Sequence, residues 1–310
     1  MKIALLGGTG FAGQNVSKAL KKNDYEFYPV SRHNGYDLRE LKHNLNFIEE
    51  INPDVIINCA AHVGSLNYVT EFAADVISDN TRMILNLYEA LKITEQKIVI
   101  IQPLANCAYP ADAVVYKESE FWNGPLHPSI MSFGSTRRMM WSIAESYYTQ
   151  LGVRTVNLIT PNMYGPYDST DPNKAHALNA LISKFVKAIH TGQKEVEIWG
   201  TGAAIREWLH VGDFAEIVIQ VIKNINDNKY NHPVNIAQNF GLSVKQLVDL
   251  ILKYIDYSGR VWYNTEKPDG APKKVMDNSE FLKVFPGFHF TSFEEGIKST
   301  AVYYHSVYPY

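Results

Sequence analysis

The sequence has little cysteine. Its 310 residues include only two, Cys59 and Cys107, which is too few for a disulfide framework, and neither belongs to a CxxC zinc pattern. Proteins without disulfides are typical of reducing compartments, so we expect a cytoplasmic protein.

Long apolar runs and an excess of one charge are also missing. No stretch approaches the ~18 apolar residues that cross a bilayer, and the first apolar run ends at Gly7, too early for a secretion signal. The 29 basic residues nearly balance 32 acidic ones, for a net charge of -3. We therefore expect no nucleic acid and no membrane as partners. The 46% of hydrophobic residues is typical of a folded globular protein.

Short Val/Ile-rich runs alternate with longer helical patterns. Strands are expected at 2–6, 25–30, 54–60, 97–103 and 154–160, and helices at 11–21, 72–91, 132–151, 178–189 and 243–255. This alternation predicts right-handed crossovers and a parallel sheet that is covered on both faces. The expected fold class is α/β, a Rossmann-type doubly wound parallel sheet with a smaller, interleaved C-terminal α/β lobe for the substrate.

The composition changes after Pro161, where a loop rich in Pro, Gly, Asp and Asn begins. No linker separates the two halves of the chain. We therefore predict a dinucleotide-binding domain at 1–160, to which about 203–240 returns. The substrate lobe is predicted to consist of 161–202 and 241–310.

Glycines crowd the turn after the first expected strand. Gly7, Gly10 and Gly13 fit GxxGxxG, and Gly8 with the latter two fits GxGxxG. Such glycines let the backbone approach a pyrophosphate at a helix N-terminus. A merely structural tight turn is the alternative, but the flanking strand and helix favour a dinucleotide site. The residues predicted to bind it are Gly7, Thr9, Gly10, Phe11, Ala12 and Gly13.

The end of the second expected strand bears on which dinucleotide binds. NAD-binding proteins place an acidic residue there for the ribose hydroxyls. This chain has Ser31 and Arg32 instead, and an arginine can pair with a 2′-phosphate. NADP(H) is therefore favoured, while NAD and a merely solvated Arg32 stay open.

The order of the motifs resembles that of the extended short-chain dehydrogenase/reductases, the NAD-dependent epimerases and dehydratases. After the glycine loop come Ala60-Ala61-His62-Val63-Gly64, Asn106-Cys107-Ala108-Tyr109-Pro110 and Pro161-Asn162-Met163-Tyr164-Gly165-Pro166. Later stretches are more specific and are similar to the GDP-L-fucose-synthase group of that family. They are WGTG at 199–202, IREWLHV at 205–211 and KPDGAPKK at 267–274.

The resemblance implies an enzyme that epimerises C3 and C5 of a GDP-linked 4-keto sugar and then reduces the ketone with NADPH. It implies that Cys107 and His176 are the base and acid of the epimerisation. The reduction uses a Ser and a YxxxK pair, but Ala105 stands at the Ser position, and Phe133 and Arg137 stand at the Tyr and Lys positions. Phe133 has no proton to donate, and Arg137 can hold a ribose without tuning a partner as Lys does.

Other residues are candidates to replace this triad. A second YxxxK pattern, from Tyr88 to Lys92, precedes the Cys107 segment on an expected helix, so we interpret it as a helix face. Tyr109 and Tyr116 are less favoured donors. The donors near the expected site that suit an enolate oxygen are Asn106, Ser132 and Ser135.

The resemblance also implies binding residues. For the cofactor they are Ala60, Ala61, His62, Arg137 and Asn162. For the nucleotide sugar they are Asn162, Lys184, Trp199, Arg206, Asp269 and Lys274, with Trp199 on the nucleobase and the cations on the diphosphate. Asp168, Asp171 and His62 share no recognisable ligand spacing, so we expect no metal.

Together these residues predict a nucleotide-sugar epimerase of the GDP-L-fucose-synthase type whose 4-keto reductase activity is lost or altered. Two alternatives stay open: an NADPH-dependent reductase with another proton donor, and a non-catalytic protein that binds a nucleotide sugar or dinucleotide. The family analogy also predicts a homodimer formed through the helices at 72–91 and 132–151.

Overall fold

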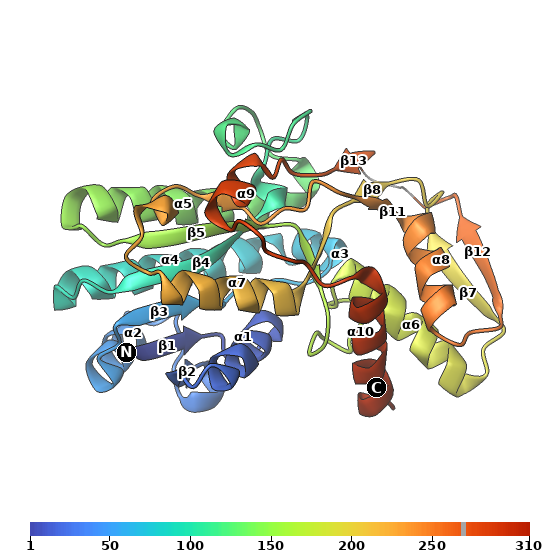
Figure 1. Cartoon of the computed structure of the whole chain (residues 1–310), viewed down its shortest axis with the longest axis horizontal. Helices are drawn as coiled ribbons and strands as arrows, with labels where there is room; N and C mark the ends of the chain where they lie inside the picture. The colour runs from blue at the N-terminus through green and yellow to red at the C-terminus, as the bar shows by residue number, and fades with distance from the viewer. Residues whose placement is uncertain (268–270) are drawn as a thin grey trace.

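A six-stranded parallel sheet forms the centre of the computed structural model (Figure 1), which describes residues 1–267 and 271–310. The strand order is β10-β5-β4-β3-β1-β2. The strands are β1 (Lys2–Leu6), β2 (Glu26–Val30), β3 (Val55–Asn58), β4 (Val99–Ala105), β5 (Thr155–Thr160) and β10 (Val234–Asn235). The chain passes from β1 to β2 on one side and returns to β3 on the other. The direction therefore switches between β1 and β3, the place where open α/β sheets bind ligands.

Helices cover both faces of this sheet, as alternate residues of β1 show. Ile3 and Leu5 belong to the core with α1 (Phe11–Lys22) and α7 (Val211–Lys223). Ala4 and Leu6 belong to the core with α2 (Leu41–Ile51), α4 (Ala73–Thr94) and α5 (Met131–Leu151). The predicted fold class is confirmed. The sequence analysis did not indicate α2, nor the short helix α3 (Leu66–Glu71) that precedes α4.

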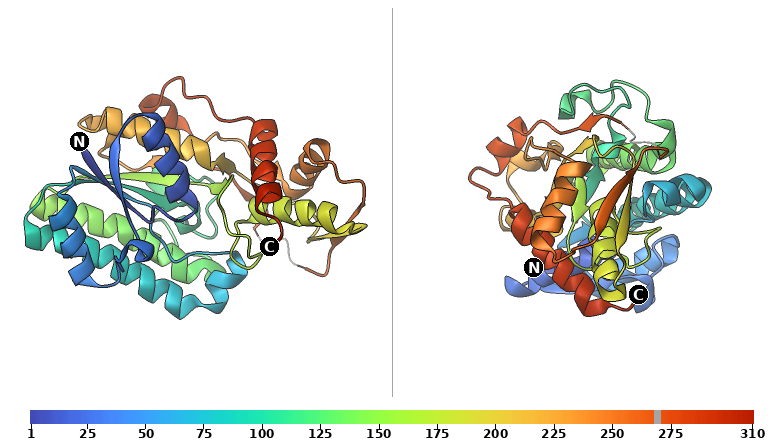
Figure 2. Two further views of the ribbon diagram at one scale, coloured as in Figure 1. Left: turned by 90° about the horizontal axis from the view of Figure 1, so that it is seen from below. Right: turned by 90° about the vertical axis from the view of Figure 1, so that its right-hand side faces the viewer.

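A smaller lobe lies beside the carboxyl ends of the sheet strands (Figures 1 and 2). Its core is formed by α6 (Ala177–Thr191), α8 (Val244–Tyr254) and α10 (Phe293–Val307). Two small sheets complete it: β7 (Glu195–Trp199) with β12 (Arg260–Asn264), and β8 (Ile205–Arg206) between β11 (Leu242–Ser243) and β13 (Lys273–Lys274).

Several segments cross between the two parts. β6 (Asn162–Tyr164) pairs with β9 (Trp208–His210), and α9 (Ser279–Val284) packs beside β10. The predicted domain boundaries stay a prediction, although α7 packs on α1 and β10 pairs with β5. Across the described residues, no helix combines the length and apolar character that crossing a membrane requires.

Candidate active site

The glycine loop brings the ends of β1 and β3 into backbone contact. A Cβ atom on Gly7 would lie 2.8 Å from Ala60 Cα, and one on Gly13 would lie 2.1 Å from the Gly7 carbonyl oxygen. Helix α1 starts after Gly10 without a side-chain cap and without an acidic residue in its first turn. Its first N–H groups are therefore left for an anion, and the loop fits a dinucleotide pyrophosphate.

The residues after β2 fit a phosphate on the adenosine ribose. Ser31 is buried, and its hydroxyl lies 2.7 Å from Asn34 Oδ1. Arg32 follows it and is exposed. A neighbouring arginine is not available in the same way, because Arg39 forms ion pairs with Asp37 and Asp79. Arg32, the cation that the sequence analysis singled out, is thus open to a ligand at this strand end.

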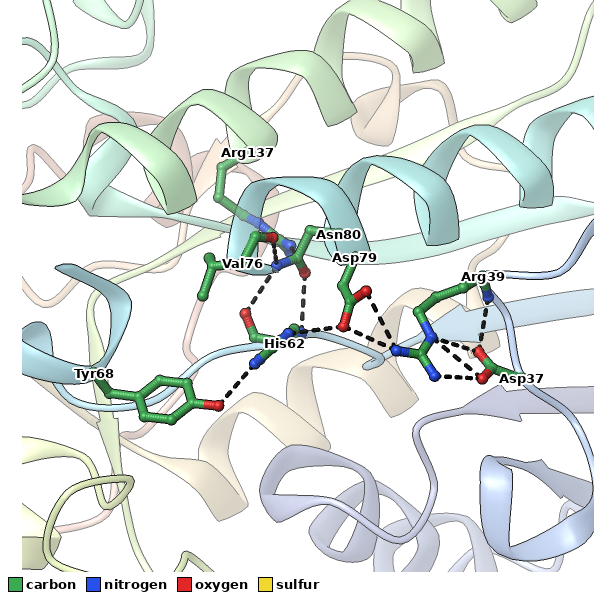
Figure 3. Close-up of polar contacts among 8 residues, drawn as sticks. All are labelled: Asp37, Arg39, His62, Tyr68, Val76, Asp79, Asn80 and Arg137. Atoms are coloured by element: carbon green, nitrogen blue, oxygen red, sulfur yellow. Dashed lines mark hydrogen bonds and ion pairs between the residues drawn. The ribbon is translucent and has the colours of Figure 1, made fainter. Parts of the chain in front are cut away.

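His62 lies in a network of polar contacts that the sequence analysis missed (Figure 3). Its Nδ1 atom is 2.9 Å from Asp79 Oδ2, and its Nε2 atom is 2.8 Å from the Tyr68 hydroxyl. The Asn80 side-chain amide forms two hydrogen bonds with the His62 backbone. It donates to the His62 carbonyl at 2.8 Å and accepts from the His62 N–H at 3.1 Å. Asn80 Oδ1 also accepts a hydrogen bond from Arg137 Nη2 at 3.0 Å. Two predicted cofactor residues, His62 and Arg137, are therefore joined through Asn80.

Arg137 is a buried cation beside an aromatic ring. Its side chain is 3% exposed, and its guanidinium carbon lies 4.6 Å from the centroid of the Phe133 ring. Burial lowers the pKa of Arg137 to about 10. Its Nε atom has no hydrogen-bond partner among the described residues. At these two positions the site offers a charge and a ring but no hydroxyl.

Cys107 lies in the 3₁₀ turn η2 (Asn106–Ala108) directly after β4. Helix α5 approaches this turn closely: a Cβ on Gly134 would lie 3.3 Å from the Cys107 carbonyl oxygen, and Arg138 Nε donates to the Ala108 carbonyl at 2.8 Å. Burial raises the pKa of Cys107 to about 11, and the charges of Lys274 and Arg137 offset part of that effect. The thiol therefore lies among cations from both lobes.

His176 is paired with a carboxylate. It precedes α6, and its Nδ1 atom is 3.1 Å from Asp168 Oδ2, to which its backbone N–H also donates at 2.8 Å. Burial lowers the pKa of His176, but the charge and hydrogen bonds of Asp168 outweigh it and raise the pKa above its usual value. The ring lies 5.2 Å from that of Phe11 in the glycine loop. The sequence analysis considered Asp168 only as a metal ligand. Its place eight residues before His176 gave no sign of this pairing.

The predicted substrate residues form two groups. Arg206 and Lys274 lie on the paired strands β8 and β13. The charge of Lys274 offsets part of the effect of burial on the pKa of Cys107. Burial, together with the neighbouring charge of Arg206, lowers the pKa of Lys274 itself. Lys184 and Trp199 meet at Glu197 instead. Lys184 Nζ donates to the Glu197 carbonyl at 2.6 Å. Trp199 is 54% exposed, and its indole nitrogen lies 3.4 Å from Glu197 Oε2.

Asn162 Nδ2 donates to the carbonyl oxygen of Glu207 at 3.3 Å, so it joins β6 to the strand segment that follows Arg206. Asp269 lies outside the described residues.

Most of the candidate hydroxyl donors are engaged elsewhere. Ser132 Oγ donates to the Val69 carbonyl at 3.0 Å, and the Tyr109 hydroxyl donates to Asn235 Oδ1 at 2.7 Å. Tyr88 of the second YxxxK pattern is buried in the core, and its hydroxyl lies 3.0 Å from Thr155 Oγ1. Nowhere in the described part of the chain do three or more His, Cys, Asp or Glu side chains form a group suited to a metal ion.

Comparison with known proteins assigns the chain to a family. Residues 3–237 match the model of the NAD dependent epimerase/dehydratase family, and the chain belongs to that family. It is 30% identical over 306 residues to GDP-L-colitose synthase from Yersinia pseudotuberculosis, with 98% of each chain covered. The resemblance to the extended reductases and the expectation of a nicotinamide dinucleotide are thereby confirmed.

Solved structures of GDP-sugar enzymes are similar to this chain over nearly its whole length. The GDP-L-fucose synthetase of Naegleria fowleri bound to NADP superposes with a TM-score of 0.88 at 25% identity, covering 99% of this chain and 94% of that one. The GDP-mannoheptose C4 reductase of Campylobacter jejuni with NADP bound gives a TM-score of 0.84 at 26% identity, covering 98% of both chains. The chain is thus an enzyme of the GDP-sugar epimerase and reductase type.

Proposed function

We propose that this enzyme is a nucleotide-sugar epimerase that moves protons at C3 or C5 of a GDP-linked 4-keto sugar and has lost or altered the 4-keto reductase activity. One observation carries the proposal. Cys107 lies in η2 directly after β4, and the charges of Lys274 and Arg137 act on its thiol. The positions that resemble the reductive Ser and Tyr hold Ala105 and Phe133, which have no hydroxyl.

Epimerisation next to a ketone needs no hydride. A base removes the proton from C3 or C5, the C–H electron pair forms a C=C bond, and the carbonyl π pair moves onto O4. A proton delivered from the opposite face then reverses this flow with inverted configuration. The site must therefore offer one group that carries a proton and one that accepts it.

The charges of the site assign these two roles. Burial raises the pKa of Cys107 to about 11, so its thiol enters the reaction with its proton. His176 has its pKa raised above the usual value by Asp168, which makes it the stronger base and stabilises the imidazolium that forms. We therefore propose that His176 removes the proton from carbon in the first step and that Cys107 delivers one from the opposite face in the second. These roles are the reverse of the base and acid roles that the family resemblance implies for Cys107 and His176.

NADP(H) is the proposed cofactor. The close backbone packing at Gly7 and Gly13 brings the uncapped start of α1 to the end of β1, where a pyrophosphate would bind, and the exposed Arg32 suits a 2′-phosphate. The solved relatives named above hold NADP. When bound, this cofactor supplies or accepts hydride, while the chain's own residues hold and orient it.

The proposed substrate is a GDP-linked keto sugar. Arg206 and Lys274 are the cations proposed for the diphosphate, and the exposed Trp199 offers a face for the base. Exposed apolar residues on α4 and α5, Ile77, Leu85 and Tyr148 among them, support a homodimer through these helices. Sizing by light scattering at low micromolar concentration tests the dimer, and a monomer there would contradict it.

One alternative has a specific observation in its favour. A structural relative with 98% coverage is named a C4 reductase, so a reductase that uses a different proton donor is the second candidate. It predicts consumption of NADPH in step with loss of the ketone.

The experiment that separates the two uses GDP-4-keto-6-deoxy-mannose in deuterated buffer, with and without NADPH. Proton NMR follows C3 and C5, and absorbance follows NADPH. Exchange without NADPH loss supports the epimerase. NADPH loss supports the reductase, whereas silence in both, with ligand-induced stabilisation retained, supports a protein that only binds.

A further inference from the structure

A line of three hydrogen-bonding side chains lies beside the site but has no part in the chemistry described above. It runs from the Tyr68 hydroxyl to His62 Nε2 at 2.8 Å and from His62 Nδ1 to Asp79 Oδ2 at 2.9 Å (Figure 3). Asp79 is held in turn by Arg39, whose Nη1 lies 3.1 Å away. A carboxylate, an imidazole and a hydroxyl in this order form a path along which protons can move.

The hydroxyl end of this line lies at the meeting point of the two lobes. Helix α3, which carries Tyr68, is tied to the start of α5 because Ser132 Oγ donates to the Val69 carbonyl at 3.0 Å. Ser132 directly precedes Phe133. On its other side α3 meets the segment that leads to His176: Ser65 N–H donates to the Asn173 carbonyl at 3.3 Å, and Lys174 Nζ lies 6.0 Å from the centroid of the Tyr68 ring.

The position of Tyr68 is closely determined. A Cβ atom on Gly64 would lie 2.8 Å from Tyr68 Cδ1, so the ring packs directly on this glycine. The His62 backbone is bracketed by Asn80, the residue that also binds Arg137. The line is therefore connected to the buried cation at the site and does not stand apart from it.

We propose that Tyr68 is the hydrogen-bond and proton donor to the ketone oxygen O4 of the sugar, and that His62 and Asp79 are its positioning residues. This inference rests on the proposed function, in which residues 105 and 133 offer O4 no hydroxyl and Asn106 Nδ2, buried without a hydrogen-bond partner among the described residues, is the other candidate donor. It supplies that donor from α3 in place of α5.

The Tyr68 hydroxyl can turn between His62 Nε2, which lies 2.8 Å away, and the bound sugar. As charge develops on O4, the proton moves from the Tyr68 oxygen to O4. Collapse of the enol returns this proton to Tyr68, so the cycle balances.

The test compares Tyr68→Phe with a matched control, Tyr28→Phe, which removes the hydroxyl of an exposed tyrosine on β2. Loss of one donor to a developing oxyanion lowers kcat by roughly 10²–10³-fold. We expect that loss in the deuterium exchange of Tyr68→Phe, with KM within about threefold, since the donor acts on charge that develops in the transition state. His62→Gln should fall between wild type and Tyr68→Phe, and Tyr28→Phe should match wild type.

A second readout does not depend on turnover. The C4 resonance of the bound, carbon-13-labelled keto sugar reports polarisation of the carbonyl, and we expect it to move upfield in Tyr68→Phe. Wild-type exchange in Tyr68→Phe, or an unchanged C4 resonance, would overturn the role of Tyr68 and leave the proposed function standing. A wild-type enzyme that binds the sugar without exchange would refute the proposed function, and the C4 resonance would still decide on Tyr68.

Discussion

Asp168 and His176 form a carboxylate–imidazole pair, 3.1 Å from Oδ2 to Nδ1, immediately before α6. Asp168 raises the pKa of His176 against the opposing effect of burial. Because the neutral ring is the form that accepts a proton, activity should rise with pH through that raised pKa. In Asp168→Asn the charge is gone, so the acidic limb of the kcat profile should move to lower pH.

The same variant should also lose rate on the plateau. The imidazolium formed during the reaction loses its counter-charge, and a positioned base contributes about 10²–10⁴-fold in all. We expect a decrease within that range, measured as deuterium exchange between pH 5 and 9. An acidic limb that stays in place would show that Asp168 does not set the proton affinity of His176.

Cys107 should limit the reaction at high pH. Burial raises the pKa of its thiol to about 11. The thiol therefore loses its proton, and with it the ability to donate, only as the pH approaches that value. In Cys107→Ser, whose hydroxyl holds its proton more strongly, formation of the inverted sugar should fall by about 10²–10⁴-fold and lose this alkaline limb. A Cys107→Ser protein that epimerises as fast as wild type would remove Cys107 from the mechanism.

The sequence was sufficient to predict the sheet and the glycine loop because both depend on local signals. The Val/Ile runs at β3 and β4 and the spacing of Gly7, Gly10 and Gly13 are each readable within about ten residues. The contacts between Gly7 and Ala60 then follow from the topology of a doubly wound sheet.

The partners of the site residues were not predictable in the same way. Asn80, which binds the His62 backbone, accepts a hydrogen bond from Arg137, 57 residues further along the chain, and Tyr68 contacts His62 from a helix that carries no motif. Such contacts depend on how α3, α4 and α5 pack, and hydrophobic periodicity gives no information about that packing. Asp168 and His176 lie only eight residues apart. In the sequence, however, Asp168 has the residue type of a metal ligand, and nothing marks it as the partner of His176.

Glu207 should act on substrate binding through the strands it joins. It is fully buried; its Oε1 accepts from the Gln238 and Asn239 N–H groups and its Oε2 accepts from Met276 N–H at 2.8 Å. Burial raises its pKa to about 7. These bonds fix the end of β13, where Lys274 lies, beside Arg206. In Glu207→Gln the new N–H₂ group faces one of these donors, which loosens that end.

We expect Glu207→Gln to weaken the binding of GDP-mannose by about tenfold, the effect of ~1.4 kcal/mol, as measured by calorimetry. Such a loss is consistent with one unsatisfied buried donor. Asp213→Asn is the control, since this buried carboxylate binds Thr291 N–H and Oγ1 at the start of α7. Equal loss of affinity in both variants would show a general loss of stability and no specific role.

Restoring three side chains should restore reduction if their replacement removed it. The variant Ala105→Ser, Phe133→Tyr and Arg137→Lys places two hydroxyls and a lysine where the resemblance has its reductive triad. Arg137 is already buried against Phe133 and bound to Asn80, so a lysine there enters a prepared polar position.

We expect NADPH consumption by this triple variant with the keto sugar to be at least about tenfold above that of wild type. The single variant Phe133→Tyr should gain little, because Ala105 still offers the ketone no second hydroxyl. Wild-type NADPH consumption as fast as that of the triple variant would show instead that another donor already serves reduction, and its loss on adding Tyr68→Phe would identify Tyr68 as that donor.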